Sequence, residues 1–309
     1  LEFRRVLFRS QSARTSVNRR LNAENRCFTR IRGQQRIGRM NRYFVVGNPV
    51  SHSLSPAIHK AFAQQFGIEM TYEARAFEDN RFAEGMGALC LKEKPAGINV
   101  TVPFKLDAAD YCEVLSDRAR AARAVNTISF YDDRPVGDNT DGAGFVADVE
   151  KRCGFALKGA RVLILGAGGA ARGLLAVLKD KGCASLCVAN RTPSRVDDLV
   201  KEFGVKPLLF TETATGGFDL VVNCTSAGLS DAAPAVPNTA FKNCALAYDL
   251  FYAAEPTPFM RLAAESGVKR VEDGLGMLVE QAAESFRVWH GKMPETKGVY
   301  ETLRKALHG

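Results

Sequence analysis

The sequence has few of the residues that build metal centres, and it has no apolar run of membrane-spanning length. Only four of its 309 residues are histidines, at positions 52, 59, 290 and 308, and its eight cysteines form no Cys-x-x-Cys pair. We therefore assign no metal. No stretch reaches the roughly 18 apolar residues that a membrane helix needs, so no membrane partner is expected. Scattered, unpaired cysteines are typical of reduced proteins, and they predict a cytoplasmic location.

Basic charge is concentrated at the beginning of the chain. Residues 1–39 hold 11 arginines, no lysine and two glutamates, a charge of +9, so residues 40–309 carry −1 of the total of +8. A body so close to neutral predicts no nucleic-acid partner. Residues 1–39 begin with Leu, lack an apolar period and precede Met40. Three interpretations are open: non-native sequence, an Arg-rich transit peptide or a nucleic-acid-binding arm. We favour a disordered or non-native extension and begin the fold at Met40.

Strands and helices are predicted to alternate through the first half of the remaining chain. Ser55 and Pro56 fit the N-cap and the first position of a helix. A β-α-β-α-β order implies parallel strands that are joined by right-handed crossovers. Two extended pieces around a turn follow. The predicted segments are strands at 42–47, 71–77 and 98–102, helices at 55–66 and 82–91, and extended pieces at 125–130 and 134–137.

Two charged residues follow predicted strands of this half. Lys105 comes just after the strand at 98–102 and starts the next helix, and Asp141 lies in a polar turn, residues 138–142, that precedes another helix. A strand end holds a side chain more rigidly than a loop tip does, and an ammonium group there can act as acid, base or anchor. Taken alone, the two residues also fit a surface lysine and ordinary turn chemistry.

The second half contains a glycine-rich turn between a strand and a helix. The buried strand at 161–165 is followed by Gly166-Ala-Gly168-Gly-Ala-Ala171, which has the spacing G-x-G-x-x-A. Gly166 allows the tight turn, Gly168 lets the backbone approach a pyrophosphate, and Ala171 allows close packing of the helix. The start of the helix offers free N–H groups and a positive dipole end to phosphates. This segment predicts a dinucleotide site.

The next strand, at 185–189, indicates which dinucleotide binds. Units that bind NAD usually carry Asp or Glu at the end of this strand, where the carboxylate holds the ribose hydroxyls. This chain has Asn190 instead, followed by Arg191 and Arg195. Guanidinium groups match a phosphate with forked hydrogen bonds, whereas a carboxylate would repel it. The sequence therefore favours NADP over NAD.

A long amphipathic helix is predicted at 274–289. Met277 and Ser285 follow its helical spacing, so both are core positions by default. Gln281 lies four residues after Met277 and therefore on the same face. Further core strands are predicted at 218–223 and 246–251.

Together these segments resemble the shikimate dehydrogenase family over about residues 42–291. One motif alone is weak to moderate evidence, but all of them in chain order are specific. Lys60, Ala171 and Leu250 stand where the family often has Asn, Ser and Met, and none of these is expected to transfer a proton. The matching segments are Gly47-Asn-Pro49, Ser53–His59, Asn99–Lys105, Ala124–Thr127, Asn139–Gly142, Gly166–Gly173, Asn190–Thr192, Tyr248–Tyr252 and Gly274–Gln281.

The resemblance implies an α/β protein with two α/β domains. Residues 40–141 and 275–309 are expected to form a substrate domain with a mostly parallel sheet, to which the C-terminal helix returns. Residues 142–274 are expected to form a Rossmann-like NADP-binding domain. The implied reaction is the reversible, NADPH-dependent reduction of 3-dehydroshikimate to shikimate in aromatic amino-acid (chorismate) biosynthesis, by a monomer or homodimer. A quinate/shikimate dehydrogenase that uses NAD and a non-catalytic dinucleotide-binding regulator remain alternatives.

Ketone reduction needs a hydride at the carbonyl carbon and a proton at the oxygen. A positioned Lys105 can stabilise the developing alkoxide and supply or relay the proton. Asp141 can pair with Lys105 and share the proton transfer. Because paired groups titrate together, the sequence does not say which of the two donates the proton. Because Lys105 and the nicotinamide site are expected to lie on different domains, closure between the two domains is expected.

A polyhydroxylated ring that carries a carboxylate needs several polar partners for its orientation. Ser53, Ser55 and Tyr252 suit the carboxylate, and Thr101, Asn126 and Gln281 suit the ring hydroxyls. The expected cofactor residues are Gly166, Ala167, Gly168, Gly169, Ala170, Asn190, Arg191, Thr192, Arg195, Leu250, Gly274 and Met277.

Overall fold

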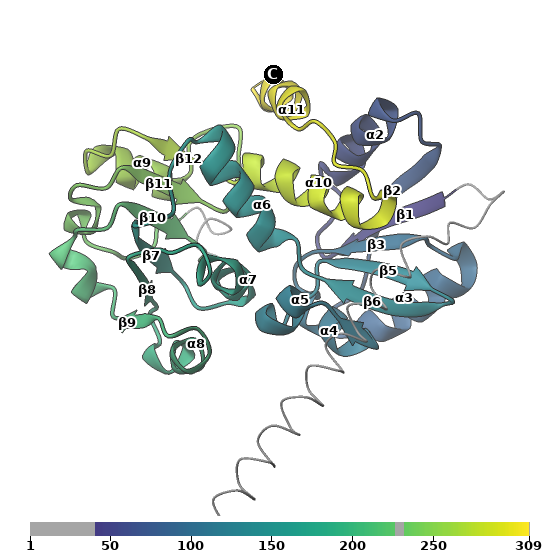
Figure 1. Cartoon of the computed structure of the whole chain (residues 1–309), viewed down its shortest axis with the longest axis horizontal. Coiled ribbons are helices and arrows are strands. Elements are labelled where there is room, and N and C mark those ends of the chain that lie inside the picture. Colours follow the sequence, from purple (N-terminus) through teal and green to yellow (C-terminus); the bar gives the residue numbers. More distant parts are fainter. Residues whose placement is uncertain (1–40, 226–231, 309) are drawn as a thin grey trace, which may run out of the picture. The chain divides into compact units, whose positions relative to one another are not determined.

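The structure is a computed structural model that describes residues 41–225 and 232–308. The predicted extension at 1–39 lies outside the described residues, so its three interpretations stay open. The described part contains two six-stranded sheets with helices packed against them (Figure 1). Two α/β units with mostly parallel sheets are the predicted fold class, which is confirmed. No helix of the described part is both long and apolar enough to cross a membrane.

The first sheet has the strand order β2-β1-β3-β5-β6-β4. β1 pairs in parallel with both β2 and β3, as the β-α-β-α-β pattern predicts, whereas β5 runs antiparallel to β3 and β6. Asp132 and Asp133 connect β5 to β6 with positive φ angles of 50° and 63°, a conformation that Asp tolerates in a two-residue hairpin turn. The strands are β1 (Asn41–Gly47), β2 (Met70–Ala76), β3 (Gly97–Val100), β4 (Val114–Leu115), β5 (Thr127–Tyr131) and β6 (Arg134–Asp138).

The helices of this half connect its strands. The first begins at Ser55, so the prediction that Ser55 is its N-cap is wrong; Leu54 holds that position. The hydroxyl of Ser53 instead accepts the backbone N–H of Ser55, at 3.3 Å. The N-cap is therefore Leu54, and the hydroxyl that accepts the Ser55 N–H belongs to Ser53. The helices are α2 (Ser55–Gln65), α3 (Phe82–Glu93), α4 (Lys105–Tyr111) and α5 (Asp117–Ala122).

The second sheet is parallel throughout, in the order β12-β11-β10-β7-β8-β9. Alternate residues of its central strand β7 enter two apolar clusters: Val162 and Ile164 in one, Leu163 and Leu165 in the other. Apolar contacts on both faces explain why its strands read as continuous apolar runs. The strands are β7 (Arg161–Leu165), β8 (Ser185–Ala189), β9 (Lys206–Leu208), β10 (Leu220–Asn223), β11 (Leu246–Asp249) and β12 (Val271–Glu272). The helices are α7 (Gly169–Leu178), α8 (Asp197–Phe203) and α9 (Pro258–Glu265), with short turns η2 (Pro193–Arg195), η3 (Thr211–Thr215) and η5 (Asn238–Phe241).

Helix α10 (Leu275–His290) returns to the first sheet's helices, as the resemblance predicts. Its Phe286 lies in one apolar cluster with Ile58 and Phe62 of α2, and α11 (Lys297–Leu307) follows it. Figure 1 shows α10 crossing α6 (Asp141–Ala147), which continues into the π-helical turn η1 (Asp148–Arg152). The crossing is close, because a Cβ on Gly144 of α6 would lie 2.5 Å from the backbone nitrogen of Gln281.

Candidate active site

Lys105 and Asp141 meet in the first α/β unit. Lys105 is the first residue of α4, soon after β3 ends, and Asp141 is the first residue of α6, soon after β6 ends. The Lys105 Nζ lies 2.7 Å from the Asp141 Oδ2 although the residues are 36 positions apart. The Asp141 side chain is 7% exposed and that of Lys105 is 25% exposed. The predicted contact is therefore present, and the ammonium group is still open to a ligand.

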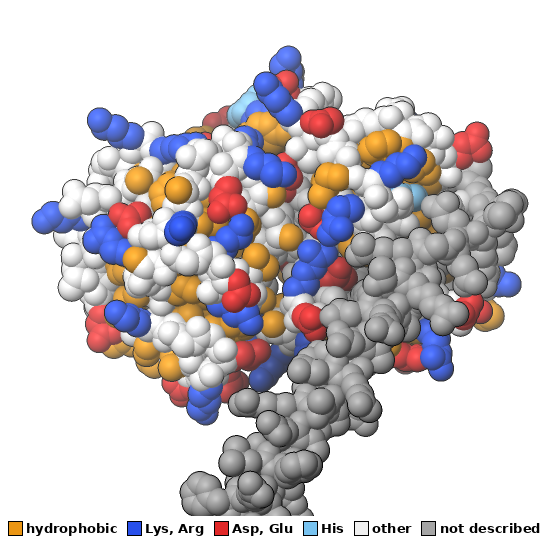
Figure 2. All heavy atoms as spheres, in the orientation of Figure 1, with side chains coloured by type: hydrophobic (Ala, Val, Ile, Leu, Met, Phe, Trp, Pro, Cys, Tyr) orange, Lys and Arg blue, Asp and Glu red, His pale blue; other side chains and the backbone are white. Residues whose placement is uncertain are grey.

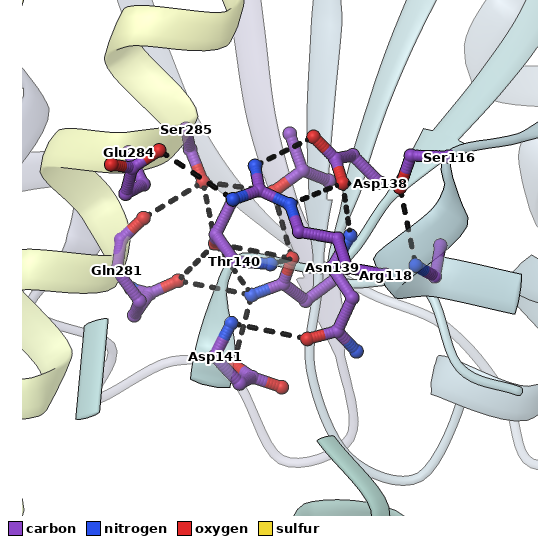
Figure 3. A network of polar contacts seen from close by, with 12 residues as sticks. Ser116, Arg118, Asp138, Asn139, Thr140, Asp141, Gln281, Glu284 and Ser285 are labelled. Carbon is purple, nitrogen blue, oxygen red and sulfur yellow. Dashed lines mark hydrogen bonds and ion pairs between the residues drawn. The ribbon is translucent and has the colours of Figure 1, made fainter. Parts of the chain in front are cut away.

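Asn126 and Gln281 join this pair. The Asn126 Nδ2 lies 2.8 Å from the Asp141 Oδ1 and 3.2 Å from the Gln281 Oε1, and the Asn126 Oδ1 accepts the backbone N–H of Thr140 at 2.9 Å. Figure 3 shows Gln281 on α10 directed toward Thr140, whose hydroxyl lies 3.4 Å from the Gln281 Oε1. Four of the predicted site residues thus form one polar cluster: Lys105, Asn126, Asp141 and Gln281.

A buried polar network that was not predicted lies beside this cluster. The Tyr72 hydroxyl donates to the Asn99 Oδ1 at 2.7 Å, and the Asn99 Nδ2 donates to Ser285 at 3.0 Å and to Thr127 at 3.1 Å. Ser285 also lies 3.2 Å from the Thr140 hydroxyl. Ser285 is indeed fully buried, but it serves the polar network as well as the core. The available signal was an asparagine, Asn99, in an apolar strand.

The expected carboxylate residues lie on two separate segments. Ser53 and Ser55 lie at the start of α2. Burial raises the pKa of the nearby Tyr72 well above its ordinary value, and the hydrogen bond with the Ser55 hydroxyl opposes this only in part. Tyr252 and Leu54 pack on the same apolar cluster of α2 and α10. Burial, followed by the charge of Asp273, raises the pKa of Tyr252 further above its ordinary value of 10, and its neutral hydroxyl can donate.

Four of the predicted substrate residues are not bonded directly to the Lys105–Asp141 pair. Within the described part of the chain, no hydrogen bond joins Lys105 or Asp141 to Ser53, Ser55, Thr101 or Tyr252. Thr101 follows β3 and its backbone N–H donates to Val46 at 2.9 Å. A Cβ on Gly47 would lie 2.4 Å from the Thr101 Cγ2, so a glycine is needed there for Thr101 to sit beside β1.

The glycine-rich turn has the local form that the sequence predicts. Gly166 has a φ of 101°, and a Cβ there would lie 3.1 Å from the backbone of Cys224. Gly168 and Gly169 have open space where a Cβ would be, so a ligand can approach this backbone. Ala171 is fully buried in α7, which begins at Gly169. The turn therefore presents the start of α7 to an anion.

The residues that follow β8 are open to solvent. Asn190 Nδ2 donates to the carbonyl of Thr192 at 2.9 Å, which holds the loop in shape. Arg191 and Arg195 are exposed, and neither forms an ion pair with the residues that the structure describes. The two guanidinium groups are therefore available to a phosphate.

Leu250, Gly274 and Met277 lie together at the end of β11. A Cβ on Gly274 would lie 2.1 Å from the carbonyl oxygen of Leu250, so only glycine allows this approach. The Met277 backbone N–H donates to the Tyr248 hydroxyl at 3.3 Å. These expected cofactor residues thus adjoin the carboxyl edge of the second sheet, where ligands of open α/β sheets bind.

Charges of both signs lie on the face of the molecule that Figure 2 shows. Lys and Arg side chains are interspersed with Asp and Glu side chains on the face that Figure 2 shows. Among residues 41–225 and 232–308, no three His, Cys, Asp or Glu side chains converge in a way that could hold a metal ion.

Three family models match consecutive parts of the chain. They are described as the shikimate dehydrogenase substrate binding domain, at residues 45–128, the shikimate/quinate 5-dehydrogenase model, at residues 148–241, and the shikimate 5'-dehydrogenase C-terminal domain, at residues 274–304.

Relatives match over almost their entire lengths. A shikimate dehydrogenase (NADP(+)) from Nitrosospira multiformis is 46% identical over 269 residues, which are 86% of this chain and 98% of the relative. The crystal structure of shikimate 5-dehydrogenase from Thermus thermophilus, in complex with NADP(H) and shikimate, has a TM-score of 0.79 and 36% identity over 87% of this chain and 100% of that one. An Ael1 enzyme from Pseudomonas putida has a TM-score of 0.80 and 41% identity, over 85% of this chain and 98% of that one.

Proposed function

The chain belongs to the shikimate dehydrogenase family, and from this premise we propose that it catalyses the reversible, NADPH-dependent reduction of 3-dehydroshikimate to shikimate. The observation that carries the proposal is the Lys105–Asp141 contact of 2.7 Å. It provides a partly exposed cation, held by a buried carboxylate, among polar groups that can orient a small hydroxylated ligand. This arrangement suits proton transfer to a ketone oxygen.

The chain's own residues supply the charge stabilisation and the proton. Asp141 fixes the Lys105 Nζ by accepting its hydrogen bond at 2.7 Å. Lys105 donates to the substrate oxygen, whose negative charge grows as the carbonyl carbon is reduced. The proton that completes the new hydroxyl comes from the Lys105–Asp141 pair. Asn126, which also donates to Asp141 at 2.8 Å, keeps the carboxylate aimed at Lys105.

The remaining polar residues orient the substrate. Ser53, Ser55 and Tyr252 hold its carboxylate with neutral hydroxyl donors, and burial raises the pKa of Tyr252 further above its ordinary value. Thr101, Asn126 and Gln281 hold its ring hydroxyls. Because each hydroxyl of the ring needs a partner when water is excluded, this number of polar groups matches the ligand.

The second unit supplies the cofactor site, and its residues fit NADP. When bound, NADPH supplies the hydride. The turn from Gly166 to Ala170 and the start of α7 hold the pyrophosphate, because their backbone is open to a ligand. Asn190, Thr192 and the exposed Arg191 and Arg195 hold the phosphate that distinguishes NADP from NAD. Leu250, Gly274 and Met277, at the end of β11, would hold the nicotinamide.

We assign the substrate domain to residues 40–141 and 275–309 and the NADP domain to residues 142–274. This division agrees with the two sheets, since β1 to β6 precede Asp141 and β7 to β12 lie between residues 161 and 272. A cytoplasmic location, a monomeric or homodimeric state and the absence of a nucleic-acid partner stay predictions from the sequence.

The proposal is tested by shikimate-dependent reduction of NADP, followed by the absorbance of the reduced nicotinamide. Replacing Lys105 by Ala removes the cation at the ketone oxygen, so kcat should fall by about 10²–10⁴-fold. Lys92→Ala is the matched control, because the Lys92 side chain is 83% exposed and belongs to α3 of the same unit. It should keep wild-type activity.

Quinate and NADH are assayed in parallel. A preference for NADH would overturn the cofactor assignment, and a wild-type enzyme without activity on either substrate would favour the non-catalytic regulator. If Lys105→Ala stayed within about threefold of the wild type, Lys105 would have no role in proton transfer.

A further inference from the structure

An arginine outside the proposed catalytic set is tied to the segment that carries Asp141. Arg118 of α5 donates from Nε to the Asp138 Oδ1 and from Nη2 to the Asp138 Oδ2, both at 2.7 Å. This is a bidentate contact, with the guanidinium fork matched to the carboxylate. Ser116, the N-cap of α5, donates its hydroxyl to the same Asp138 at 2.5 Å (Figure 3). Asp138 is therefore fixed from α5 by three hydrogen bonds.

Asp138 is in turn connected to Asp141 through the backbone. The Asp138 Oδ1 accepts the backbone N–H of Asn139 at 2.7 Å, and the Asn139 Oδ1 accepts the backbone N–H of Asp141 at 3.1 Å. The Asn139 Nδ2 donates to the carbonyl of Ala124 at 3.0 Å. The path from the carboxylate of Asp138 to the backbone of Asp141 is thus two hydrogen bonds long, and all of its residues are buried.

Arg118 also reaches α10. Its Nη1 lies 3.6 Å from the Glu284 Oε2. Glu284 precedes Ser285, which lies 3.2 Å from the Thr140 hydroxyl, and follows Gln281 by three residues. Arg118 therefore joins the two elements that bring Asp141 and Gln281 to the site.

The burial of these charges argues for a positioning role. The Arg118 side chain is 24% exposed and that of Asp138 is 12% exposed. Burial by itself would raise the pKa of Asp138, but the hydrogen bonds and the charge of Arg118 outweigh it and hold that pKa below its usual range. A buried ion pair adds little net stability over an apolar pair of the same size. A bidentate geometry does, however, fix the orientation of the chain that carries it.

We propose that Arg118 is a positioning residue, which through Asp138 and Glu284 holds Asp141 and Gln281 in place around Lys105. This inference rests on the proposed function, because it assigns Arg118 a part in orienting the proton-transfer pair. Arg118 does not contact Lys105 or Asp141 itself in the described structure. Its effect on the reaction is carried by the backbone of residues 138–141 and by α10.

The test compares Arg118→Met with Arg118→Lys. Methionine removes the positive charge and both guanidinium hydrogen bonds from Asp138. We therefore expect kcat for shikimate oxidation to fall by about 10- to 100-fold, while KM for NADP stays within about twofold. Lysine keeps one charged contact but loses the fork, so it should restore part of the lost kcat. A fold that had merely loosened would change KM for both substrates and would not be rescued by lysine.

The matched control is Arg161→Met. Arg161 forms a bidentate contact with Asp219, at 3.1 Å from Nε and 2.8 Å from Nη2, at the start of β7. Arg161 lies at the amino end of the central strand β7, whereas the glycine-rich turn follows the carboxyl end of the same strand. Arg161→Met should therefore keep the wild-type kcat and KM values.

The outcomes separate the two proposals. A wild-type enzyme that is inactive on shikimate refutes the proposed function, and the crystal structure of Arg118→Met then decides the positioning role. In that crystal structure, the Lys105 Nζ and the Asp141 Oδ2 should have moved beyond hydrogen-bond distance, and a pair kept at the wild-type distance overturns the inference. If the wild type is active and Arg118→Met matches Arg161→Met in kcat, the inference also fails.

A second variant keeps the test decisive if Arg118→Met does not fold. Glu284→Gln removes the carboxylate charge that faces Arg118 and also Arg287 of α10, and it leaves the Arg118–Asp138 pair intact. Arg287→Gln, which removes only the second of these ion pairs, is its control. Glu284→Gln should raise KM for shikimate by about two- to fivefold, because Gln281 loses its support, and should leave KM for NADP unchanged. An unchanged KM for shikimate would overturn the inference.

Discussion

Acid should destabilise this protein through His59, a buried histidine beneath the proposed carboxylate site. The His59 side chain is fully buried, and its ring stacks on Tyr72 with centroids 4.3 Å apart and planes 8° apart. Burial, followed by the charge of His290, lowers the pKa of His59 to about 3, against a smaller upward contribution from Asn99. Protonation of His59 is therefore strongly unfavourable in the folded state.

The sign and size follow from proton linkage. Between a pKa of about 3 in the folded state and the ordinary value of 6.5, the unfolded chain binds a proton that the folded chain does not. The stability that neutral His59 contributes is present above pH 6.5 and is lost as the pH falls toward the folded pKa. From neutral pH to about pH 5, the free energy of unfolding should fall by about 2 kcal/mol on account of this group.

Urea unfolding of the wild type and of His59→Phe, at about pH 7.5 and at about pH 5, measures this contribution. Other groups also titrate, among them His290, so the quantity to compare is the loss between the two pH values. That loss should be smaller in His59→Phe by about 2 kcal/mol, whatever repacking costs at neutral pH. His308→Phe is the control, because His308 is exposed. If His59→Phe loses as much stability as the wild type on acidification, the reasoning is wrong.

Three further predictions concern packing, the cofactor and the N-terminal segment. Gly142→Ala should lower the free energy of unfolding by about 1–3 kcal/mol in thermal or urea unfolding, because a Cβ would lie 2.4 Å from the carbonyl oxygen of Gly173. Gly87→Ala on α3, where a Cβ meets nothing within 4 Å, should instead stabilise. Arg191→Ala should raise KM for NADPH about tenfold and leave KM for NADH unchanged; equal effects on both would contradict the phosphate contact. Deletion of residues 1–39 should leave kcat/KM within about twofold, and a larger loss would show that the segment contributes to the enzyme.

Local features of the site could be read from the sequence because they depend on neighbouring residues. The apolar strand before Gly166, the spacing of the turn and the helix after it are all set within about a dozen positions. The same holds for Lys105, which starts the helix that follows β3. The N-cap of α2 was missed because propensity favours a serine there, whereas the helix begins at Ser55 and leaves Leu54 at the N-cap position.

Contacts between distant segments were decided by the tertiary structure. Helical spacing correctly put Ser285 at a buried position, but only the packing of α10 against the first sheet shows that Thr127, Asn99 and Thr140 oppose it. Arg118 gave no signal at all, since an arginine in a short helix usually lies at the surface. Its bidentate contact depends on β6 passing α5 at the right register.

By itself, then, the sequence determined the alternation of strands and helices and the dinucleotide turn, because periodicity and glycine spacing act over short stretches of chain. The chemical groups offered to the substrate followed from the resemblance of its motifs to the family. The pairing of Lys105 with Asp141 was expected from the resemblance, but only the tertiary structure shows how the two residues are brought together and which other groups join them. The 2.7 Å contact of Lys105 with Asp141 and the fixing of Asp141 through Asp138 require β3, β6 and α10 to converge. That convergence is set by strand order and helix packing, which no local pattern specifies.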